Sequence, residues 1–316
     1  MECSRREFFG LGGGAVAAAA LPSFKVDSES PARTQINKAF RRPPLTVHSH
    51  KINVGARAPF KALHVTDSHL TLCNSRENDP RKVELAMNRS TPWHSNWHYF
   101  EEAIHHAREN GEMLLHTGDL IDFVSIANLE AAGRAFYDDE WFVCAGNHEY
   151  SKYVGEARED EKYKQDSFAR VQRIYPNDLT LASRVVNGVN FVAIDDVYMY
   201  IPGKAVDSFR KEVEKGLPIV LMCHCPLFSE EFYDYEMKRR GKTNLVAIEE
   251  DAAKGRKRNA DKITYDFVRY LRGEKALKAI LSGHIHFHCV NRFSPTAIQY
   301  TGGCGAQGDV SALEFV

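Results

Sequence analysis

The chain carries almost no net charge. Its 41 lysine and arginine residues are offset by 42 aspartate and glutamate residues, which leaves a net charge of −1 at pH 7. A chain without an overall positive field has no general means of holding nucleic acid or an anionic membrane surface. Its one compact basic run, Gly255-Arg256-Lys257-Arg258, is typical of a solvated loop. We therefore expect no nucleic-acid partner.

Long apolar runs are also missing. Residues 11–21 form a weakly apolar run, but a membrane span needs about 20 apolar residues. The run follows Ser4-Arg5-Arg6-Glu7-Phe8-Phe9, which resembles the twin-arginine export signature, and an Ala-x-Ala cleavage option ends at Ala20. The sequence predicts a signal peptide over residues 1–24, export by the twin-arginine machinery to the periplasm or the exterior, and no stable membrane anchor. A flexible N-terminus with an incidental arginine pair is the alternative.

Cysteine pairs with metal-binding spacing are scarce. The chain has seven cysteines, and Cys223-x-Cys225 has the wrong spacing for a zinc knuckle and no second pair near it. Cys144 and Cys223 lie within apolar, strand-like runs. We therefore expect buried free thiols rather than a disulfide framework.

Internal repeats and a second composition regime are absent too, so one catalytic domain over residues 45–316 is predicted after a polar linker over residues 25–44. Within it, strand-like and helix-like patterns alternate. Runs at 45–52 and 60–66 predict an opening hairpin, and runs at 181–186 and 191–194 around Asn187-Gly188 predict another. Further strands are expected at 113–117, 141–145, 219–223 and 279–282. Helices are expected at 92–110, 126–138, 161–174, 206–215 and 260–271.

Five of the apolar runs end in potential metal ligands. The clusters are Asp67-Ser68-His69, Gly118-Asp119-Leu120-Ile121-Asp122, Gly146-Asn147-His148-Glu149, His224, and Gly283-His284-Ile285-His286. In open α/β sheets, ligands bind beyond the carboxyl ends of the strands, so the five clusters can converge on one crevice. Imidazole, carboxylate and amide oxygen together suit divalent zinc, iron or manganese, and a carboxylate can bridge two ions. Each motif is weak alone, but five in order predict a two-metal site.

This ordered set resembles the calcineurin-like metallophosphoesterase superfamily. The resemblance implies an α/β fold, a four-layer α-β-β-α sandwich of two packed mixed sheets with outer helices. It implies a first metal held by Asp67, His69, Asp119 and His286. It implies a second metal held by Asn147, His224 and His284, with Asp119 bridging. His148 is then a catalytic residue that does not bind metal, and Asp122 is its partner. A helix N-terminal cap is the alternative role of Asp122.

The resemblance also implies the reaction, which is hydrolysis of a small phosphoester. Two divalent ions, Mn, Zn or Fe, would deliver a bridging hydroxide in line with phosphorus. Two departures argue against particular branches of this superfamily. Phe123-Val124 stands where protein serine/threonine phosphatases have Arg-Gly, and Asp122 stands where purple acid phosphatases have an iron-binding tyrosine. A phosphatase and a phosphodiesterase both remain open. The alternatives are a non-catalytic protein that binds metal and phosphoesters, or an exported nuclease.

His94 and His98 form one more candidate pair. They lie four residues apart at the start of a predicted helix, and such spacing can bind metal. Because the two-metal site is already complete, we expect the pair to face solvent or to line the cleft. In the cleft, His94 and His98 would contact substrate.

Overall fold

The computed structural model describes residues 44–89, 95–156, 160–248 and 260–316. The predicted signal peptide lies outside the described residues, as do almost all of the predicted linker, His94 and the basic run at 255–258. The domain boundaries therefore stay predictions.

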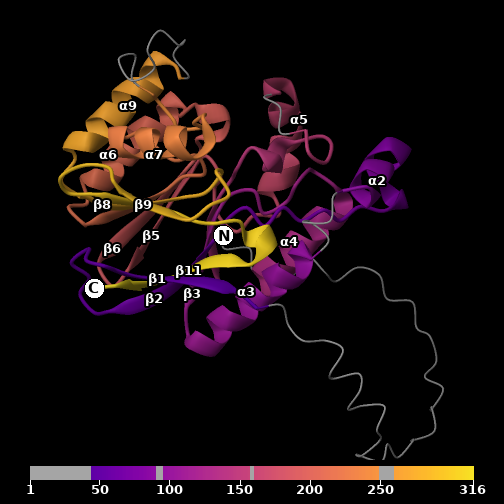
Figure 1. The fold of residues 1–316 in the computed structure, drawn as a ribbon, viewed down its shortest axis with the longest axis horizontal. Helices are drawn as coiled ribbons and strands as arrows, with labels where there is room; N and C mark the ends of the chain where they lie inside the picture. Colours follow the sequence, from indigo (N-terminus) through magenta and orange to yellow (C-terminus); the bar gives the residue numbers. More distant parts are fainter. Residues whose placement is uncertain (1–43, 90–94, 157–159, 249–259) are drawn as a thin grey trace, which may run out of the picture. The chain divides into compact units, whose positions relative to one another are not determined.

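The described strands form two mixed sheets (Figure 1). The first sheet has five strands in the order β1 (Thr46–Ile52), β11 (Asp309–Phe315), β2 (Phe60–Val65), β3 (Met113–Thr117) and β4 (Trp141–Cys144). The second has six strands in the order β5 (Leu181–Val186), β6 (Val189–Ile194), β7 (Ile219–Met222), β8 (Leu277–Ser282), β10 (Ile298–Thr301) and β9 (Cys289–Arg292).

Alternate residues of the strands pack into different cores. Leu115 of β3 and Phe191 of β6 belong to a core shared by the two sheets. Their neighbours Leu114 and Val192 belong to two other cores, each shared between one sheet and its helices. Because side chains alternate along a strand, both faces of each sheet are buried. This explains why the central strands read as continuous apolar runs.

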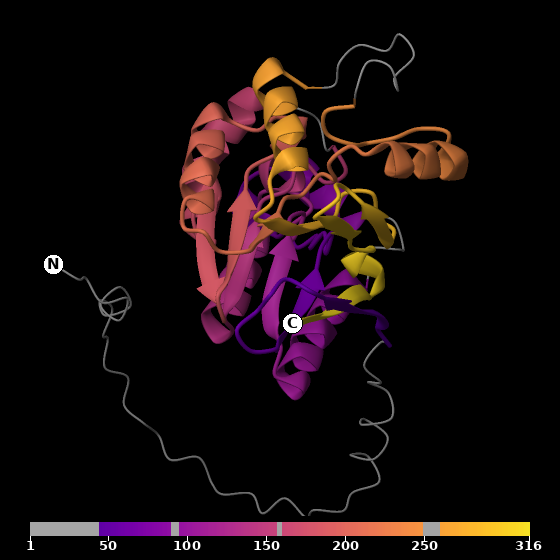
Figure 2. The same ribbon diagram turned by 90° about the vertical axis from the view of Figure 1, so that its left-hand side faces the viewer.

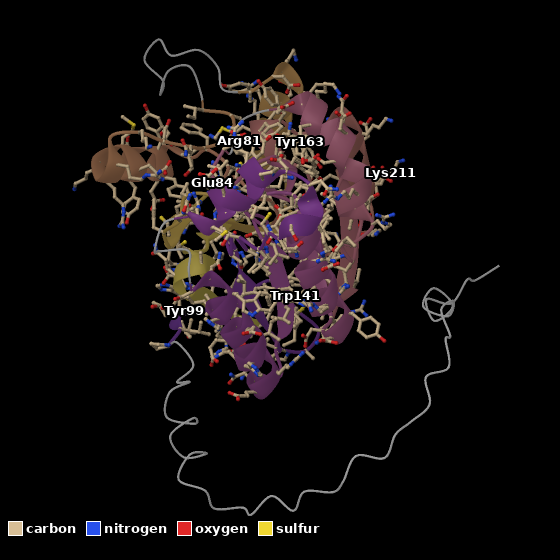
Figure 3. The ribbon with its side chains drawn as sticks, turned by 90° about the vertical axis from the view of Figure 1, so that its right-hand side faces the viewer. Arg81, Glu84, Tyr99, Trp141, Tyr163 and Lys211 are labelled. Carbon is tan, nitrogen blue, oxygen red and sulfur yellow. The ribbon has the colours of Figure 1, made fainter. Side chains whose placement is uncertain are left out.

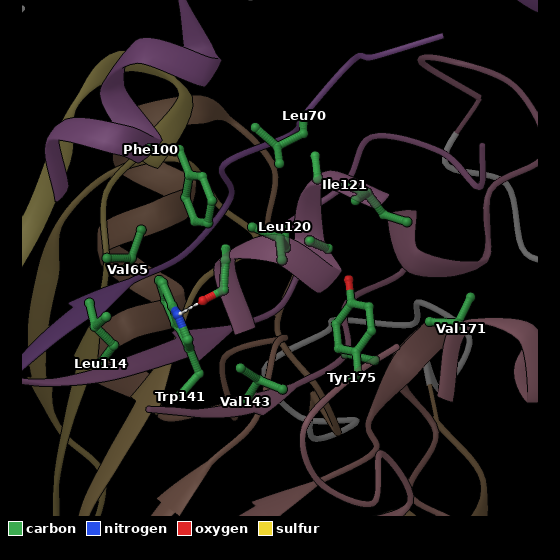
Figure 4. Packing of buried hydrophobic residues seen from close by; sticks show 14 of the residues in the cluster. Val65, Leu70, Phe100, Leu114, Leu120, Ile121, Trp141, Val143, Val171 and Tyr175 are labelled. Atoms are coloured by element: carbon green, nitrogen blue, oxygen red, sulfur yellow. Dashed lines mark hydrogen bonds between the residues drawn. The ribbon is translucent and has the colours of Figure 1, made fainter. Parts of the chain in front are cut away.

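The helices cover the outer faces of the two sheets. Three helices pack against the first sheet: α3 (Asn96–Asn110), α4 (Ile126–Asp138) and α5 (Glu161–Gln172). Two helices pack against the second sheet: α6 (Gly203–Val213) and α9 (Lys262–Gly273). Figure 4 shows Phe100 of α3 beside Trp141 of β4, with 5.6 Å between the ring centroids. The predicted four-layer sandwich is therefore confirmed.

Two further helices lie apart from these layers, α2 (Pro80–Met87) and α7 (Glu230–Arg240). Figure 2 shows α7 extending away from the sheets. Arg81 and Glu84 of α2 and Lys211 of α6 are exposed (Figure 3). Within the described part of the chain, no helix is both long enough and apolar enough to cross a membrane.

The predicted opening hairpin is wrong. The strands β1 and β2 both form, but β11 lies between them, parallel to β1 and antiparallel to β2. The partner comes from the far end of the chain, so no local pattern around residues 45–66 could reveal it. The second hairpin is confirmed, since β5 and β6 pair antiparallel. Its turn residues Asn187 and Gly188 have φ of 45° and 83°, and positive values at both positions are what a two-residue type I′ turn requires.

Candidate metal centre

The five ligand clusters meet where strands of both sheets end. Asp67, Asp119 and Asn147 follow β2, β3 and β4 of the first sheet, while His224 follows β7 and the pair His284 and His286 follows β8 of the second. Four of these residues, Asp119, Asn147, His284 and His286, line a cavity of about 320 Å³. Its described walls are formed by Asp119, Asn147, His148, Tyr198, Met199, Cys225, Asn244, His284 and His286.

One group of donor atoms joins Asp67, His69 and His286. Oδ1 of Asp67 lies 3.2 Å from Nε2 of His286 and 3.7 Å from Nε2 of His69. The two Nε2 atoms are 3.0 Å apart. The other oxygen of Asp67 accepts hydrogen bonds from the Thr66 hydroxyl and the backbone N–H of His284, which fixes the carboxylate plane. One carboxylate and two imidazole donors therefore point at one position.

A second group joins Asp119, His224 and His284. Nε2 of His224 lies 3.2 Å from Oδ2 of Asp119 and 3.2 Å from Nδ1 of His284. Nδ1 of His224 donates to the carbonyl of Thr117 at 2.8 Å, which leaves Nε2 as the free electron-pair donor. Oδ2 of Asp119 is also 3.8 Å from Nε2 of His69 in the first group. Asp119 thus stands between the two groups.

The donor set fits divalent cations. Among the described residues, no group donates a hydrogen bond to Oδ1 of Asp67 or to Oδ1 of Asn147, although both atoms are buried. An unpartnered buried acceptor costs about 1 to 3 kcal/mol, and more when charged. A cation at each group would satisfy both oxygens. Burial lowers the pKa of His284 to about 3, so this imidazole is in the neutral form that binds metal.

The backbone is strained at the predicted ligands. Five of the seven have positive φ although none is glycine, and they are Asp67 (53°), His69 (46°), Asp119 (55°), His284 (71°) and His286 (60°). Such conformations cost about 1 to 3 kcal/mol each and cluster at functional sites. The turns therefore hold the donor atoms in place at a cost in stability.

Glycine at position 146 permits the closest approach. A Cβ atom there would collide with Oδ1 of Asp119 and lie 2.8 Å from Cε1 of His224. Only a residue without a side chain lets the loop after β4 pass between these two predicted ligands.

His148 lies at the cavity, and its ring is held by Asp122. Its Nδ1 lies 2.9 Å from the backbone oxygen of Asp122 and 3.2 Å from Oδ1 of the same residue. Burial alone would lower the pKa of His148, but the charge of Asp119 and the hydrogen bond to Asp122 raise it to about 9. A histidine that is protonated and oriented by a carboxylate has the properties of a general acid.

Asp122 contacts other residues besides His148. Its Oδ1 also lies 2.9 Å from Nδ1 of His69 and 3.1 Å from Nη2 of Arg89, and its Oδ2 accepts from the N–H of Gly155 at 3.1 Å. Burial would raise the pKa of this carboxyl, but hydrogen bonds from His148 and His69 hold it well below its usual range. The contacts to His69 and Arg89 could not be read from the sequence.

Glu149 holds the two loops that follow β3 and β4 by accepting hydrogen bonds from their backbone N–H groups. Its fully buried carboxylate accepts backbone N–H groups of Asp119 (2.8 Å), Leu120 (2.8 Å) and Gly146 (2.6 Å), and the hydroxyl of Tyr175 (2.8 Å). Glu149 stands in the third cluster, but sequence reasoning gave it no role. Its function depends on backbone donors that a sequence does not display.

Asp196 is a second supporting carboxylate that sequence reasoning missed. Its two oxygens accept the backbone N–H groups of His224 and Cys225, each at 2.8 Å. Asp195-Asp196 follows β6 directly, so the signal used for the other clusters, a strand ending in acidic residues, could have found it. It fixes the turn that carries His224.

The predicted substrate contact at His98 gains no further support. The side chain of His98 on α3 is 59% exposed, and its Nδ1 lies 3.7 Å from Oε2 of Glu101. Other residues form the described walls of the cavity. Since His94 lies outside the described residues, the contact of either histidine with substrate stays a prediction.

A family match agrees with this geometry. Residues 60–288 match the family model of the calcineurin-like phosphoesterases. No curated protein matches. Similar solved structures include a dimetal phosphatase from Danio rerio, with 10% identity over 80% of this chain and 91% of that chain, at a TM-score of 0.47.

Two other similar structures are longer proteins. A 5′-nucleotidase from Candida albicans shows 13% identity over 84% of this chain and 47% of its own, at a TM-score of 0.39. The NAD nucleotidase of Haemophilus influenzae shows 12% identity over 81% of this chain and 47% of its own, at a TM-score of 0.42. The chain spans about half the length of these two proteins. On the family match and on donor groups suited to metal, the chain belongs to the calcineurin-like phosphoesterases and is a metal-dependent phosphoester hydrolase.

Proposed function

We propose that the enzyme works with two divalent ions. The first would be held by Asp67, His69, Asp119 and His286. The second would be held by Asn147, His224 and His284, with Asp119 shared. The observation that carries the proposal is the position of Asp119, whose Oδ2 lies 3.2 Å from His224 in one donor group and 3.8 Å from His69 in the other.

The side chains around the metals have separate tasks. When bound, two divalent ions would neutralise the phosphoryl oxygens and lower the pKa of the attacking water toward neutrality. His148 lines the cavity, and its Nδ1 is held by Asp122, so Nε2 can donate a proton to the leaving oxygen. Tyr198 and Met199 form part of the cavity wall beside these groups.

Turnover with defined metals tests the proposal. The apoenzyme is loaded with manganese, zinc or iron and assayed with a chromogenic phosphomonoester and the matching diester. We expect turnover of at least one substrate at a stoichiometry of two ions per chain. Two bound ions without turnover of either ester would instead favour a non-catalytic binding protein, and full activity with one ion would remove the dinuclear mechanism.

Export by the twin-arginine route is a further part of the proposal, supported by Ser4-Arg5-Arg6-Glu7-Phe8-Phe9. A fusion of residues 1–24 to a reporter that is active only outside the cytoplasm should be exported. Replacement of Arg5 and Arg6 by lysine should abolish export. Export that survives this replacement would contradict the twin-arginine route.

A further inference from the structure

The thiol of Cys225 lies at the second donor group. Cys225 is 1% exposed and forms part of the cavity wall with His284. Its Sγ and one ring nitrogen each of His224 and His284 all lie within 4.8 Å of one another. A thiol and two imidazoles from two separate loops therefore face the same small volume.

A second observation indicates that a cation belongs there. Oδ1 of Asn147 lines the same cavity, is buried, and accepts no hydrogen bond from any described residue. Asp119 completes the surroundings, because its Oδ2 lies 3.2 Å from Nε2 of His224. The volume beside Cys225 thus contains an unsatisfied amide oxygen, a carboxylate and two imidazoles.

Two hydrogen bonds hold the backbone of Cys225. Its N–H donates to Oδ2 of Asp196 at 2.8 Å, and its carbonyl accepts the thiol of Cys223 at 3.4 Å. The two thiols therefore differ in what they face. The thiol of Cys223 contacts backbone, and among the described residues it belongs to no group of potential metal ligands.

We infer that Cys225 is a thiolate ligand of the second metal and biases this position toward zinc over manganese. The inference rests on the proposed two-metal function. Thiolate sulfur is a soft ligand that zinc accepts readily, whereas manganese prefers carboxylate, carbonyl and water oxygen. On binding, the thiol proton passes to solvent and the sulfur electron pair is donated to the cation. Burial raises the pKa of the Cys225 thiol well above its ordinary value, so a neighbouring cation is what would produce the thiolate.

Cobalt substitution tests the ligand directly. The full chain is stripped of metal and titrated with Co²⁺, whose visible d–d bands report any bound ion and whose near-ultraviolet charge-transfer band requires a thiolate ligand. We expect both signals in the parent protein. Cys225→Ser should lose the charge-transfer band and keep the visible bands, and retention of the visible bands shows that the variant is folded.

Two matched variants complete the experiment. Cys223→Ser removes the neighbouring buried thiol, and Cys304→Ser removes the thiol that interacts with His286. Both should keep the charge-transfer band. Visible bands without a charge-transfer band in the parent protein would overturn the role of Cys225 and leave the two-metal proposal standing. Absence of both signals would overturn the two-metal proposal itself.

Metal competition gives a second measurement. Apoenzyme equilibrated with zinc and manganese should take up zinc preferentially. In Cys225→Ser, the ratio of bound zinc to bound manganese should fall at least about tenfold. Loss of a residue that only supports a metal ligand already costs about 10- to 100-fold in metal affinity. An unchanged zinc-to-manganese ratio in Cys225→Ser would contradict the inference.

Discussion

One carboxylate oxygen, Oδ1 of Asp122, lies 2.9 Å from Nδ1 of His69 and 3.2 Å from Nδ1 of His148. It therefore supports a proposed metal ligand and the proposed general acid at the same time. Asp122→Asn should lower turnover at least about 100-fold and weaken metal binding about 10- to 100-fold. Turnover assays and metal analysis after dialysis check both effects. Asp207→Asn, at a 74% exposed side chain on α6, is the matched control and should change neither.

His148 should affect turnover without affecting metal content. It is buried at the cavity, and its ring nitrogen Nδ1 lies 2.9 Å from the backbone oxygen of Asp122, which is not a predicted metal ligand. His148→Ala should lower turnover about 10²- to 10⁴-fold while two ions remain bound. His106→Ala, on the part of α3 outside the cavity walls, should be unaffected. Loss of metal together with turnover in His148→Ala would assign this residue to the ligands.

Glu149 should matter for stability and for metal binding. In Glu149→Gln, an amide NH₂ replaces one of the two acceptor oxygens. If it replaces Oε2, the NH₂ faces the backbone N–H groups of Gly146 and Asp119, and if it replaces Oε1, it faces the N–H of Leu120, so two donors are brought together. We expect a loss of about 3 kcal/mol in the free energy of unfolding, measured by urea denaturation, and weaker metal binding. Tyr175→Phe removes one hydrogen bond to the same carboxylate and should cost only about 1 kcal/mol. Equal effects of the two variants would contradict the anchoring role.

Removal of metal should destabilise the fold. Cations that bind only the folded chain stabilise it by about 4 kcal/mol at a concentration about 1,000 times Kd. We expect a chelator to lower the thermal unfolding temperature, and added zinc or manganese to restore it in a concentration-dependent way. Asp119→Asn, which removes the shared carboxylate, should lose most of this response. A melting temperature that does not depend on metal would argue against tight binding.

The ion pair of the partly buried Lys164 with the buried Asp195 should stabilise the turn after β6. Nζ of Lys164 lies 2.8 Å from Oδ2 of Asp195, and the side chains are 13% and 6% exposed. Lys164→Met leaves the carboxylate buried without its cation, at a cost of about 3 to 5 kcal/mol. Addition of Asp195→Asn should recover part of this loss. Chemical denaturation of the two single variants and the double variant measures the coupling, and purely additive losses would contradict it.

Much of the metal centre could be predicted from the sequence because every predicted ligand lies within four residues of the end of a strand. The run from 113 to 117 predicts a strand and makes Asp119, just after it, a candidate ligand. Parallel strands then bring such ends to one edge of a sheet. What the sequence does not display is the acceptor role of Glu149 and Asp196, since the groups that they bind are backbone N–H groups.

Strand pairing was the least predictable part of the fold. The β1 and β2 runs were recognised as strands, but a local pattern favours pairing of sequence neighbours, and here β11 separates the two. Helix limits were closer, and α4 begins and ends as predicted because Ser125 caps it by accepting the N–H of Asn128. The helix predicted from 206 begins at Gly203 instead, where Pro202 precedes it with the φ of −60° that a helix start tolerates.

The position of β11 also constrains the order of events during synthesis. Asp309–Phe315 lies between two strands that are made near the beginning of the domain, and it pairs with both along their length. A growing chain therefore presents β1 and β2 with open hydrogen-bonding edges until residues 309–315 have emerged from the ribosome. Asp67 lies just after β2, so ion capture by the first donor group should follow the synthesis of residues 309–315.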